Sequence, residues 1–342
     1  MSLAPERRLE LYRQLRRVRA IDERLSALQR QGRVGFHGSC AGQEVAPVAA
    51  GLALRPSDWV FPALRESWVM LVRGFPLDRY LAQDFGTALD VAKGRQMPSH
   101  QSARSVNVVS WSSCIGTQLP QAVGMALAAR KLGRDDVALA FLGDGATSHP
   151  DFHAALNFAA VFAAPCVFVC QNNQFAISVP VERQSGNPRL FEKAAAYAIP
   201  GRRVDGNDAE LVLSALSEAA ERARSGAGPS FIECLTYRMG PHSSSDDPAR
   251  YRDAAETERW LARDPIALLR ERLLADGLLS PEADAALSAE LNIEIEQAVT
   301  RAETAPPPAA STLFDDVYAL RPRHLEEQAE QHAAANRRAI GS

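Results

Sequence analysis

One continuous stretch, residues 135–178, constrains the fold of this chain more than any other part. Two short apolar segments, Val137–Leu142 and Cys166–Cys170, each end in polar residues, and Asp151–Phe162 between them carries apolar residues at helical spacing. This order predicts a strand, a loop, a helix and a second strand, which is the repeating unit of a parallel sheet. Open sheets of this kind bind ligands at the carboxyl ends of their strands. We therefore expect an α/β fold, a parallel sheet with helices on both faces, with functional groups at that edge.

The polar residues at the two strand ends allow several interpretations. Gly143-Asp144-Gly145 follows the first strand, and Asn172-Asn173 follows the second. A dinucleotide fingerprint would need a third glycine where Ser148 stands and an acid after the second strand, and a P-loop would need Gly-Lys-Ser/Thr. The remaining interpretations are a turn capped by the aspartate, or a Mg²⁺ site that bridges to a diphosphate. The asparagine pair favours the metal site, because it places a second oxygen ligand at the same edge.

The amino-acid sequence around these residues resembles that of a known family. The segments LGDGATS, DFHAALNFAAV, CQNN and AIS are similar to the alpha subunit of the decarboxylating component of 2-oxo acid dehydrogenase complexes, and the resemblance spans residues 10–320. It implies a thiamine diphosphate-binding fold with Mg²⁺ held by Asp144, Asn173 and the main-chain carbonyl of Phe175. It also places the cofactor against one glycine-rich turn, which consists of Gly143, Asp144, Gly145 and Ala146.

The same resemblance implies further site residues on other loops. Arg65 matches a ligand of the diphosphate, and arginine suits that task because its guanidinium binds phosphate bidentately. Ser113 and Ile115 match positions beside the aminopyrimidine ring, where Ile115 would force the cofactor into a bent shape. His242 matches a catalytic histidine that also contacts the cofactor. From the residues alone, a surface ion pair for Arg65, core packing for Ile115 and a solvated loop for His242 remain open.

Other positions match the family more loosely. A structural monovalent cation, K⁺, is implied near Ser112, Thr117 and Gln118. His100 ends the loop 93–100, and on sequence we favour a solvent-facing position for it over a catalytic one. Ser243 matches a site that is phosphorylated in some eukaryotic relatives. The chain departs from the family pattern in a few places, which are Leu64, His149-Pro150 and Pro241.

The implied activity is the oxidative decarboxylation of a 2-oxo acid, with acyl transfer to a lipoyl-bearing acyltransferase. The segment GRQMPSH and the loop that begins at His242 are most similar to branched-chain members, while pyruvate and acetoin members remain alternatives. In the family's α2β2 architecture the beta subunit supplies the glutamate that activates the cofactor, so we expect the isolated chain to be inactive. A nicotinamide dehydrogenase and an inactive scaffold subunit are the other classes to be tested.

Composition limits the remaining possibilities. The 342 residues are 46% hydrophobic and 23% charged with a formal net charge of −3, which is typical of a globular chain without an electrostatic footprint for nucleic acid. Five scattered cysteines fit a reducing, cytoplasmic setting, and no apolar run of membrane length is present. We expect a helical arm over residues 1–34, the cofactor-binding domain over 35–303, and a linker, clip and helix over 304–342.

Overall fold

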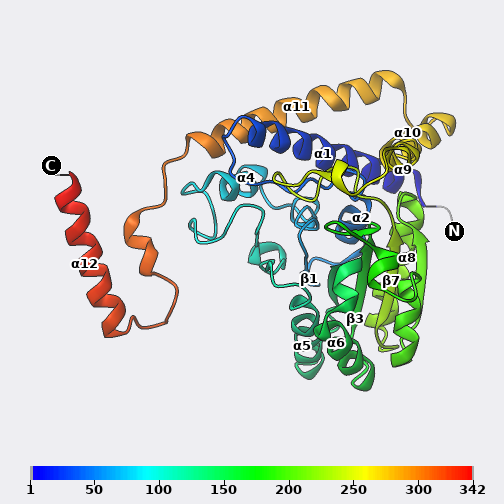
Figure 1. The fold of residues 1–342 in the computed structure, drawn as a ribbon, viewed down its shortest axis with the longest axis horizontal. Coiled ribbons are helices and arrows are strands. Elements are labelled where there is room, and N and C mark those ends of the chain that lie inside the picture. The colour runs from blue at the N-terminus through cyan, green and yellow to red at the C-terminus, as the bar shows by residue number, and fades with distance from the viewer. Residues whose placement is uncertain (1–2, 341–342) are drawn as a thin grey trace.

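The centre of the molecule is a sheet of five parallel strands with helices packed on both faces (Figure 1). A computed structural model describes residues 3–340 of the chain. The strand order is β1-β2-β3-β7-β6, and every neighbouring pair runs parallel. The predicted α/β fold is therefore confirmed. The strands are β1 (Trp59–Phe61), β2 (Ala138–Gly143), β3 (Cys166–Asn172), β6 (Gly201–Asp205) and β7 (Ser230–Leu235).

The strand–loop–helix–strand unit that the sequence predicts is present at the middle of this sheet. β2 and β3 are buried along nearly their whole length, as expected for parallel strands covered on both faces. They are joined by a 3₁₀ turn, η2 (Asp144–Ser148), and by helix α6 (Pro150–Val161), which His149 caps by accepting a hydrogen bond from the Asp151 amide. The register pairs Gly143 with Gln171, so both strands end at the same level.

Side chains of the central strands alternate between two apolar layers. Leu139 and Phe141 pack with helices α2 (Val45–Ala53) and α8 (Ala209–Arg224), whereas Ala140 and Leu142 pack with α5 (Gln118–Lys131) and α6 on the opposite face. Alanines and larger apolar side chains are mixed in both layers. Burial of this apolar surface on both faces is the main stabilising contribution to the sheet.

The N-terminal helix α1 (Pro5–Arg30) is part of the same core. Its apolar stripe is buried, and the stripe packs in the cluster that also contains α2 and α8. α1 lies along α10 (Pro265–Ala275) and α11 (Pro281–Thr304), as Figure 1 shows. The boundaries that we predict at residues 34 and 303 stay predictions. The buried residues of the stripe are Leu11, Leu15, Val18, Ile21, Leu25 and Leu28.

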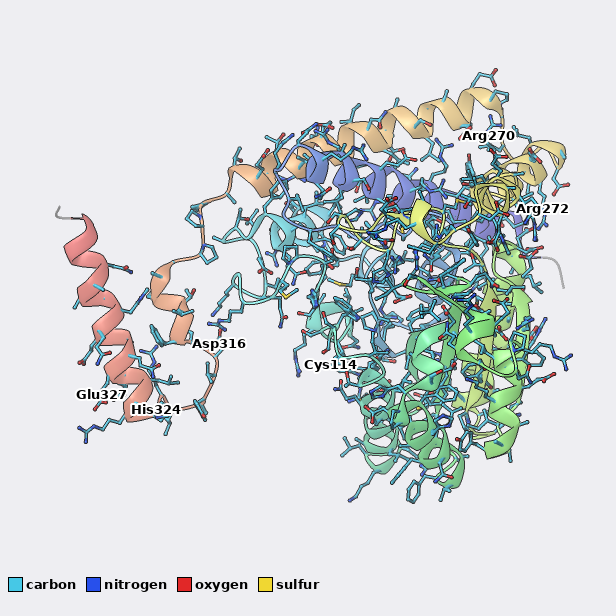
Figure 2. All side chains as sticks on the ribbon, in the orientation of Figure 1. Cys114, Arg270, Arg272, Asp316, His324 and Glu327 are labelled. Atoms are coloured by element: carbon cyan, nitrogen blue, oxygen red, sulfur yellow. The ribbon has the colours of Figure 1, made fainter. Side chains whose placement is uncertain are left out.

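The C-terminal part forms an arm that stands away from the sheet (Figure 1). It comprises η5 (Ala310–Phe314) and α12 (Arg323–Ile340), and Figure 2 places Asp316, His324 and Glu327 along it. Its base is tied to the body where Ala88 donates its amide hydrogen to the Pro306 carbonyl and Lys93 pairs with Asp316. The docking of the predicted clip on the body or on a partner stays a prediction, and several apolar side chains of this arm are exposed. They are Leu313, Val317, Tyr318 and Leu320.

No helix within residues 3–340 is long and apolar enough to cross a membrane.

Short elements complete the connections. The helices and turns are α3 (Val69–Val72), α4 (Leu77–Phe85), η1 (Arg104–Val106), α7 (Val181–Gln184), η3 (Leu190–Tyr197), η4 (Pro248–Arg250) and α9 (Ala254–Leu261), and an antiparallel pair is formed by β4 (Phe175–Ala176) and β5 (Val179–Pro180).

Candidate active site

A cavity of about 610 Å³ lies at the carboxyl ends of β2, β3 and β7. It is the place where the sequence predicts a ligand, because three buried strands end there in polar residues. All the residues that the sequence nominated for the site line this cavity, although they come from five separate segments of the chain. They are Arg65, Ser113, Ile115, Gly143, Asp144, Gly145, Ala146, Asn173, Phe175 and His242.

Asp144 is the buried acid of this cavity. Its side chain is only 2% exposed, and burial raises the pKa of its carboxyl to about 6, although a hydrogen bond from Gln184 opposes that rise. Gln184 donates from Nε2 to Oδ2 at 2.6 Å, and the main-chain amide of Asn173 also donates to the carboxylate. No ion pair neutralises Asp144 within residues 3–340. A buried carboxylate that forms no ion pair is a suitable ligand for a hard metal ion.

Asn173 and Phe175 lie directly beside Asp144. The Asn173 side chain donates from Nδ2 to Oε1 of Gln43 at 2.8 Å, and its Oδ1 accepts the Phe175 amide at 3.2 Å. The Phe175 carbonyl accepts a hydrogen bond from Nη1 of Arg238 at 3.1 Å and retains a second lone pair. Three oxygens of the predicted metal site are thus gathered at one end of the cavity.

Gly145 is required by the close approach of two loops at this end. A Cβ added there would lie 2.7 Å from the Cβ of Ala176, which real side chains do not tolerate. The 174–177 loop itself turns sharply, because Gln174 and Ile177 both have positive φ, at 75° and 55°. The glycine therefore lets the turn that carries Asp144 pack against the loop that carries Phe175.

Arg65 is buried in the cavity wall, which rules out the surface ion pair. Its Nε donates to the Ser39 carbonyl at 2.8 Å, and its Nη2 donates to the His242 carbonyl. Burial, together with the positive charge of Arg238, lowers its pKa to about 10. Arg65 is thus a cation that holds the 39 and 242 loops together through main-chain oxygens.

His242 lines the cavity beside Arg65, whose Nη2 donates to its carbonyl. Burial and the charges of Arg65 and Arg238 lower its pKa to about 4, so the ring is neutral at pH 7. Its Nδ1 is buried, and no partner for it exists in the described part of the chain. A neutral imidazole donates from one nitrogen only, so His242 can offer one hydrogen bond to a ligand. The solvated-loop alternative is excluded, because the ring lines the cavity.

The wall formed by residues 111–118 contains a correction to the sequence interpretation. His100 is 6% exposed and lines the cavity, so the prediction of a solvent-facing loop histidine is wrong. Its Nδ1 meets the Pro98 carbonyl at 3.0 Å, and its Nε2 meets the Ser113 hydroxyl at 2.7 Å. Because a carbonyl can only accept, Nδ1 carries the hydrogen and Ser113 donates to Nε2. The loop 93–100 folds back to the site, which its composition does not reveal.

Ile115 lies at the mouth of the cavity and is 56% exposed, so core packing does not explain it. Met97 and Ile177 are equally exposed beside the same cavity, and the three side chains form an apolar rim. Thr117 and Gln118, two of the residues suggested for a monovalent cation, follow Ile115 in the chain. Thr117 donates to the Cys114 carbonyl at 2.9 Å, and Gln118 donates to the Phe141 carbonyl at 2.8 Å. Occupancy by K⁺ stays a prediction.

The departures from the family pattern also have defined positions. Leu64 lines the cavity with an apolar side chain, and it lies near Gly38. His149 begins α6 as its cap, and its ring lies close to Gly116 on the cavity wall. Pro241 directly precedes His242. These changes alter the wall, but they remove none of the metal-facing oxygens.

Several site residues escaped the sequence interpretation. Arg238 is 1% exposed and donates to the carbonyls of Phe175 and Ile177. Arg238 lies just beyond the end of β7. The reasoning that predicted Asp144, from polar residues at the carboxyl ends of strands, could therefore have predicted Arg238 as well. Gln171 donates to the buried carboxylate of Glu66, which also shapes the turn before Arg65 by accepting its amide. No local pattern marks these pairs, because their partners are distant in sequence.

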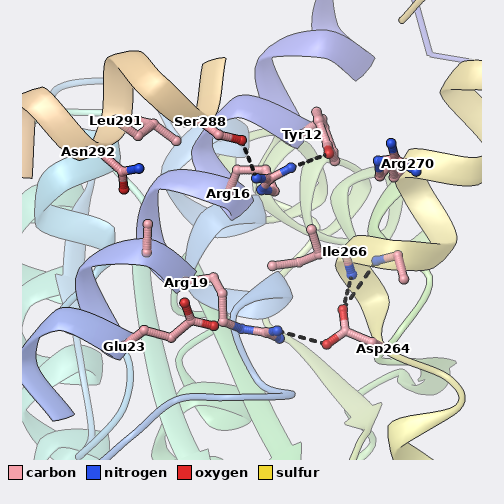
Figure 3. A pocket seen from close by; sticks show the side chains of 12 residues that line it. Tyr12, Arg16, Arg19, Glu23, Asp264, Ile266, Arg270, Ser288, Leu291 and Asn292 are labelled. Carbon is pink, nitrogen blue, oxygen red and sulfur yellow. Dashed lines mark hydrogen bonds and ion pairs between the residues drawn. The ribbon is translucent and has the colours of Figure 1, made fainter. Parts of the chain in front are cut away.

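A second cavity, of about 460 Å³, lies between α1, α10 and α11 (Figure 3). Arg16 contacts Tyr12 at 2.8 Å and Ser288 at 2.7 Å and pairs with Asp284, while Arg19 pairs with Asp264 at 2.8 Å. These charges balance each other across the helix contacts. The cavity is therefore a gap within a structural ion-pair network.

Comparison with known proteins shows the family of this chain. The family model "Dehydrogenase E1 component" matches residues 12–311. A 3-methyl-2-oxobutanoate dehydrogenase subunit alpha of Mycobacterium tuberculosis is 44% identical over 96% of this chain and 87% of its own length. The 2-oxoisovalerate dehydrogenase alpha subunits of Bacillus subtilis and Homo sapiens are 40% and 39% identical, over 93% and 97% of this chain and 97% and 75% of their own lengths.

Proposed function

Because this chain belongs to the dehydrogenase E1 component family, we propose that it is the alpha subunit of a branched-chain 2-oxo acid dehydrogenase. The family depends on thiamine diphosphate. The observation that carries the proposal is the buried, unneutralised carboxylate of Asp144, which lies beside Asn173 and the Phe175 carbonyl at the end of the cavity. The substrate class rests on the names of the relatives.

The polar groups of the cavity fit Mg²⁺ and a diphosphate. Asp144, Asn173 and the Phe175 carbonyl offer the oxygen ligands that Mg²⁺ prefers, and diphosphate oxygens commonly complete such a shell. The buried Nε2 of Gln43 and Nδ1 of His242 lack partners within residues 3–340, so both are available to an anionic ligand. Arg65 and Arg238 add positive charge to the same cavity.

Thiamine diphosphate, when bound, supplies the electron sink that decarboxylation of a 2-oxo acid requires. The chain's own residues bind and orient. Asp144 and Asn173 would hold the metal, and Arg65 would hold the diphosphate while fixing the loop of His242. His242, neutral at pH 7, would donate one hydrogen bond to an anionic oxygen. Ile115 would contact the cofactor from the mouth.

A partner subunit is part of the proposal. The rim of Met97, Ile115 and Ile177 leaves apolar surface in water around the cavity, which is typical of a surface that another protein covers. The acids among the cavity-lining residues are Asp144 and Glu66, which already accept hydrogen bonds from Gln184 and Gln171. We propose that a beta subunit covers the rim in an α2β2 assembly and supplies the activating carboxylate, and that the acyl group passes to a lipoyl-bearing acyltransferase.

Reconstitution of the alpha–beta pair tests this function. With thiamine diphosphate and Mg²⁺, we expect faster decarboxylation of 2-oxoisovalerate than of pyruvate, and no turnover by the isolated chain. A preference for pyruvate, or activity only with acetoin, would replace the substrate assignment and leave the cofactor assignment intact. Binding of NAD in place of thiamine diphosphate would refute the function altogether, and a complex that binds neither would indicate an inactive scaffold.

A further inference from the structure

Two glutamines outside the glycine-rich motif contact the side chains of both candidate metal ligands. Gln43 lies just before α2 and is 2% exposed, and Gln184 is the last residue of α7. Gln43 reaches Asn173, and Gln184 reaches Asp144. The two glutamines are far apart in sequence, yet they approach the strand ends of β2 and β3 from different elements.

The hydrogen bonds of Asn173 determine which atom of its amide can face a cation. The Phe175 amide must donate, so the Asn173 atom that it meets at 3.2 Å is the oxygen Oδ1. The other atom, Nδ2, is therefore the one that meets Gln43, and it needs an acceptor there. Gln43 supplies this acceptor with Oε1 at 2.8 Å. Gln43 thus keeps the nitrogen of Asn173 away from a cation and leaves Oδ1 with a free lone pair.

Gln184 plays the corresponding part for Asp144. Its Nε2 donates to Oδ2 at 2.6 Å, and together with the main-chain amide of Asn173 this bond orients the carboxylate. The backbone of the same turn is held separately, because Thr147 donates to the Asp144 carbonyl and accepts from Lys193. Only the side-chain rotation depends on Gln184. Oδ1 is the carboxylate oxygen that Gln184 leaves free.

We propose that Gln43 and Gln184 are positioning residues that orient Asn173 and Asp144 for a bound Mg²⁺. The inference rests on the proposed function, because it assigns the metal to this cavity. Groups that orient metal ligands typically contribute 10- to 100-fold to metal affinity. Gln43 has a second feature that fits, since its Nε2 is buried at the cavity and has no partner among the described residues, so it can donate to an anionic oxygen of the ligand.

The test uses the alpha–beta complex with Gln184→Ala and Gln43→Met. Thiamine diphosphate binding is followed by calorimetry over a series of Mg²⁺ concentrations, and Mn²⁺ binding is followed by electron paramagnetic resonance with inorganic diphosphate present. Both variants are expected to need about 10- to 100-fold more Mg²⁺ for half-saturation. At saturating Mg²⁺ the Gln184→Ala variant should regain wild-type cofactor affinity and kcat, because only the orientation of a ligand has been lost.

Gln101→Ala is the matched control. Gln101 donates from Nε2 to the buried carboxylate of Asp84 at 3.2 Å, which is the same kind of bond outside the cavity. This variant is expected to be less stable with an unchanged Mg²⁺ requirement. Gln43 is buried, so the partly exposed Gln184 keeps the test valid if Gln43→Met does not fold.

The outcomes separate this inference from the proposed function. If wild type binds Mg²⁺ and thiamine diphosphate but a folded Gln184→Ala complex has the wild-type Mg²⁺ requirement, the positioning role is overturned while the proposed function stands. If wild type binds neither Mn²⁺ nor cofactor, the proposed function fails and this inference fails with it. A rise in Mg²⁺ requirement that is matched by Gln101→Ala would assign the effect to general loosening and would also overturn the role.

Discussion

The cavity at the sheet edge and the cavity between α1, α10 and α11 contain similar charged residues and use them differently. The cavity between α1, α10 and α11 has Arg16, Arg19 and Arg270, and each of these pairs with a carboxylate. The cavity at the sheet edge has Arg65 and Arg238, which donate to main-chain carbonyls. Arginines whose charge is balanced by acids hold helices together. Arginines that form no ion pair with a carboxylate in the described chain, beside a buried acid that also forms none, prepare a cavity for a charged ligand.

The pKa shifts in the two regions show the same contrast. At the helix cavity, Arg270 and Tyr12 outweigh the effect of burial and lower the pKa of Asp284, so its charged form is stabilised. At the sheet edge, burial and the arginines lower the pKa of His242 to about 4, while burial raises the pKa of Asp144 to about 6. Both shifts there disfavour the charged form. A bound metal ion and a bound anion would each reverse one of them.

The largest expected effect is on cofactor binding when the unneutralised acid is removed. Asp144→Ala should weaken Mg²⁺-dependent binding of thiamine diphosphate to the alpha–beta complex by more than about 100-fold, because it removes the proposed anionic ligand. The variant also leaves Nε2 of Gln184 without its acceptor, which should cost about 1–3 kcal/mol of stability. Calorimetric titration measures the affinity, and an unchanged affinity would refute the role of Asp144.

His242→Ala is expected to separate turnover from binding. Loss of a positioned hydrogen-bond donor should lower kcat by roughly 100-fold, while cofactor affinity falls much less, because Arg65 and the metal ligands remain. Steady-state rates and a cofactor titration on the same preparation provide both numbers. Equal losses in the two measurements would reassign His242 as a clamp for the diphosphate.

Asp284→Ala removes a carboxylate at the cavity between α1, α10 and α11, as Asp144→Ala does at the sheet edge. It leaves the buried hydroxyl of Tyr12 and the guanidinium of Arg16 without their acceptor, which should cost about 1–3 kcal/mol of stability. Cofactor affinity should stay at the wild-type value. Urea denaturation and calorimetry check the two parts, and a change in affinity would show that the cavities are coupled.

The smallest expected effect is a dependence of stability on pH. The folded pKa of His242 is about 4 and its ordinary value is 6.5, so the unfolded chain binds a proton more readily as pH falls from 6.5 to 4. Stability from this group is therefore intact above pH 6.5 and declines below it, by about 1–2 kcal/mol allowing for partial solvent exposure of the ring. His242→Gln should lose less stability than wild type between pH 7 and pH 4 in urea denaturation. Parallel curves would contradict the assigned environment.

Several site residues could be predicted because their positions follow a rule of the fold. Asp144 and Asn173 stand at the ends of two buried strands, and parallel strands bring such ends together. The loop of Arg65 and the loop of His242 required the family resemblance, since neither has a periodic pattern. His100 was misjudged because its loop folds back onto the cavity through contacts that a composition of glycine and proline does not specify.

The sequence by itself determined the parallel sheet and the acid and amide at its strand ends, because hydrophobic periodicity and strand direction are local properties. Only the tertiary structure decided which charges are neutralised. The pairing of Gln43 with Asn173 and of Gln184 with Asp144, and the isolation of Asp144 from any ion pair in residues 3–340, depend on contacts between distant segments. Those contacts distinguish the cavity at the sheet edge from the ion-pair network beneath α1, although both contain similar residues.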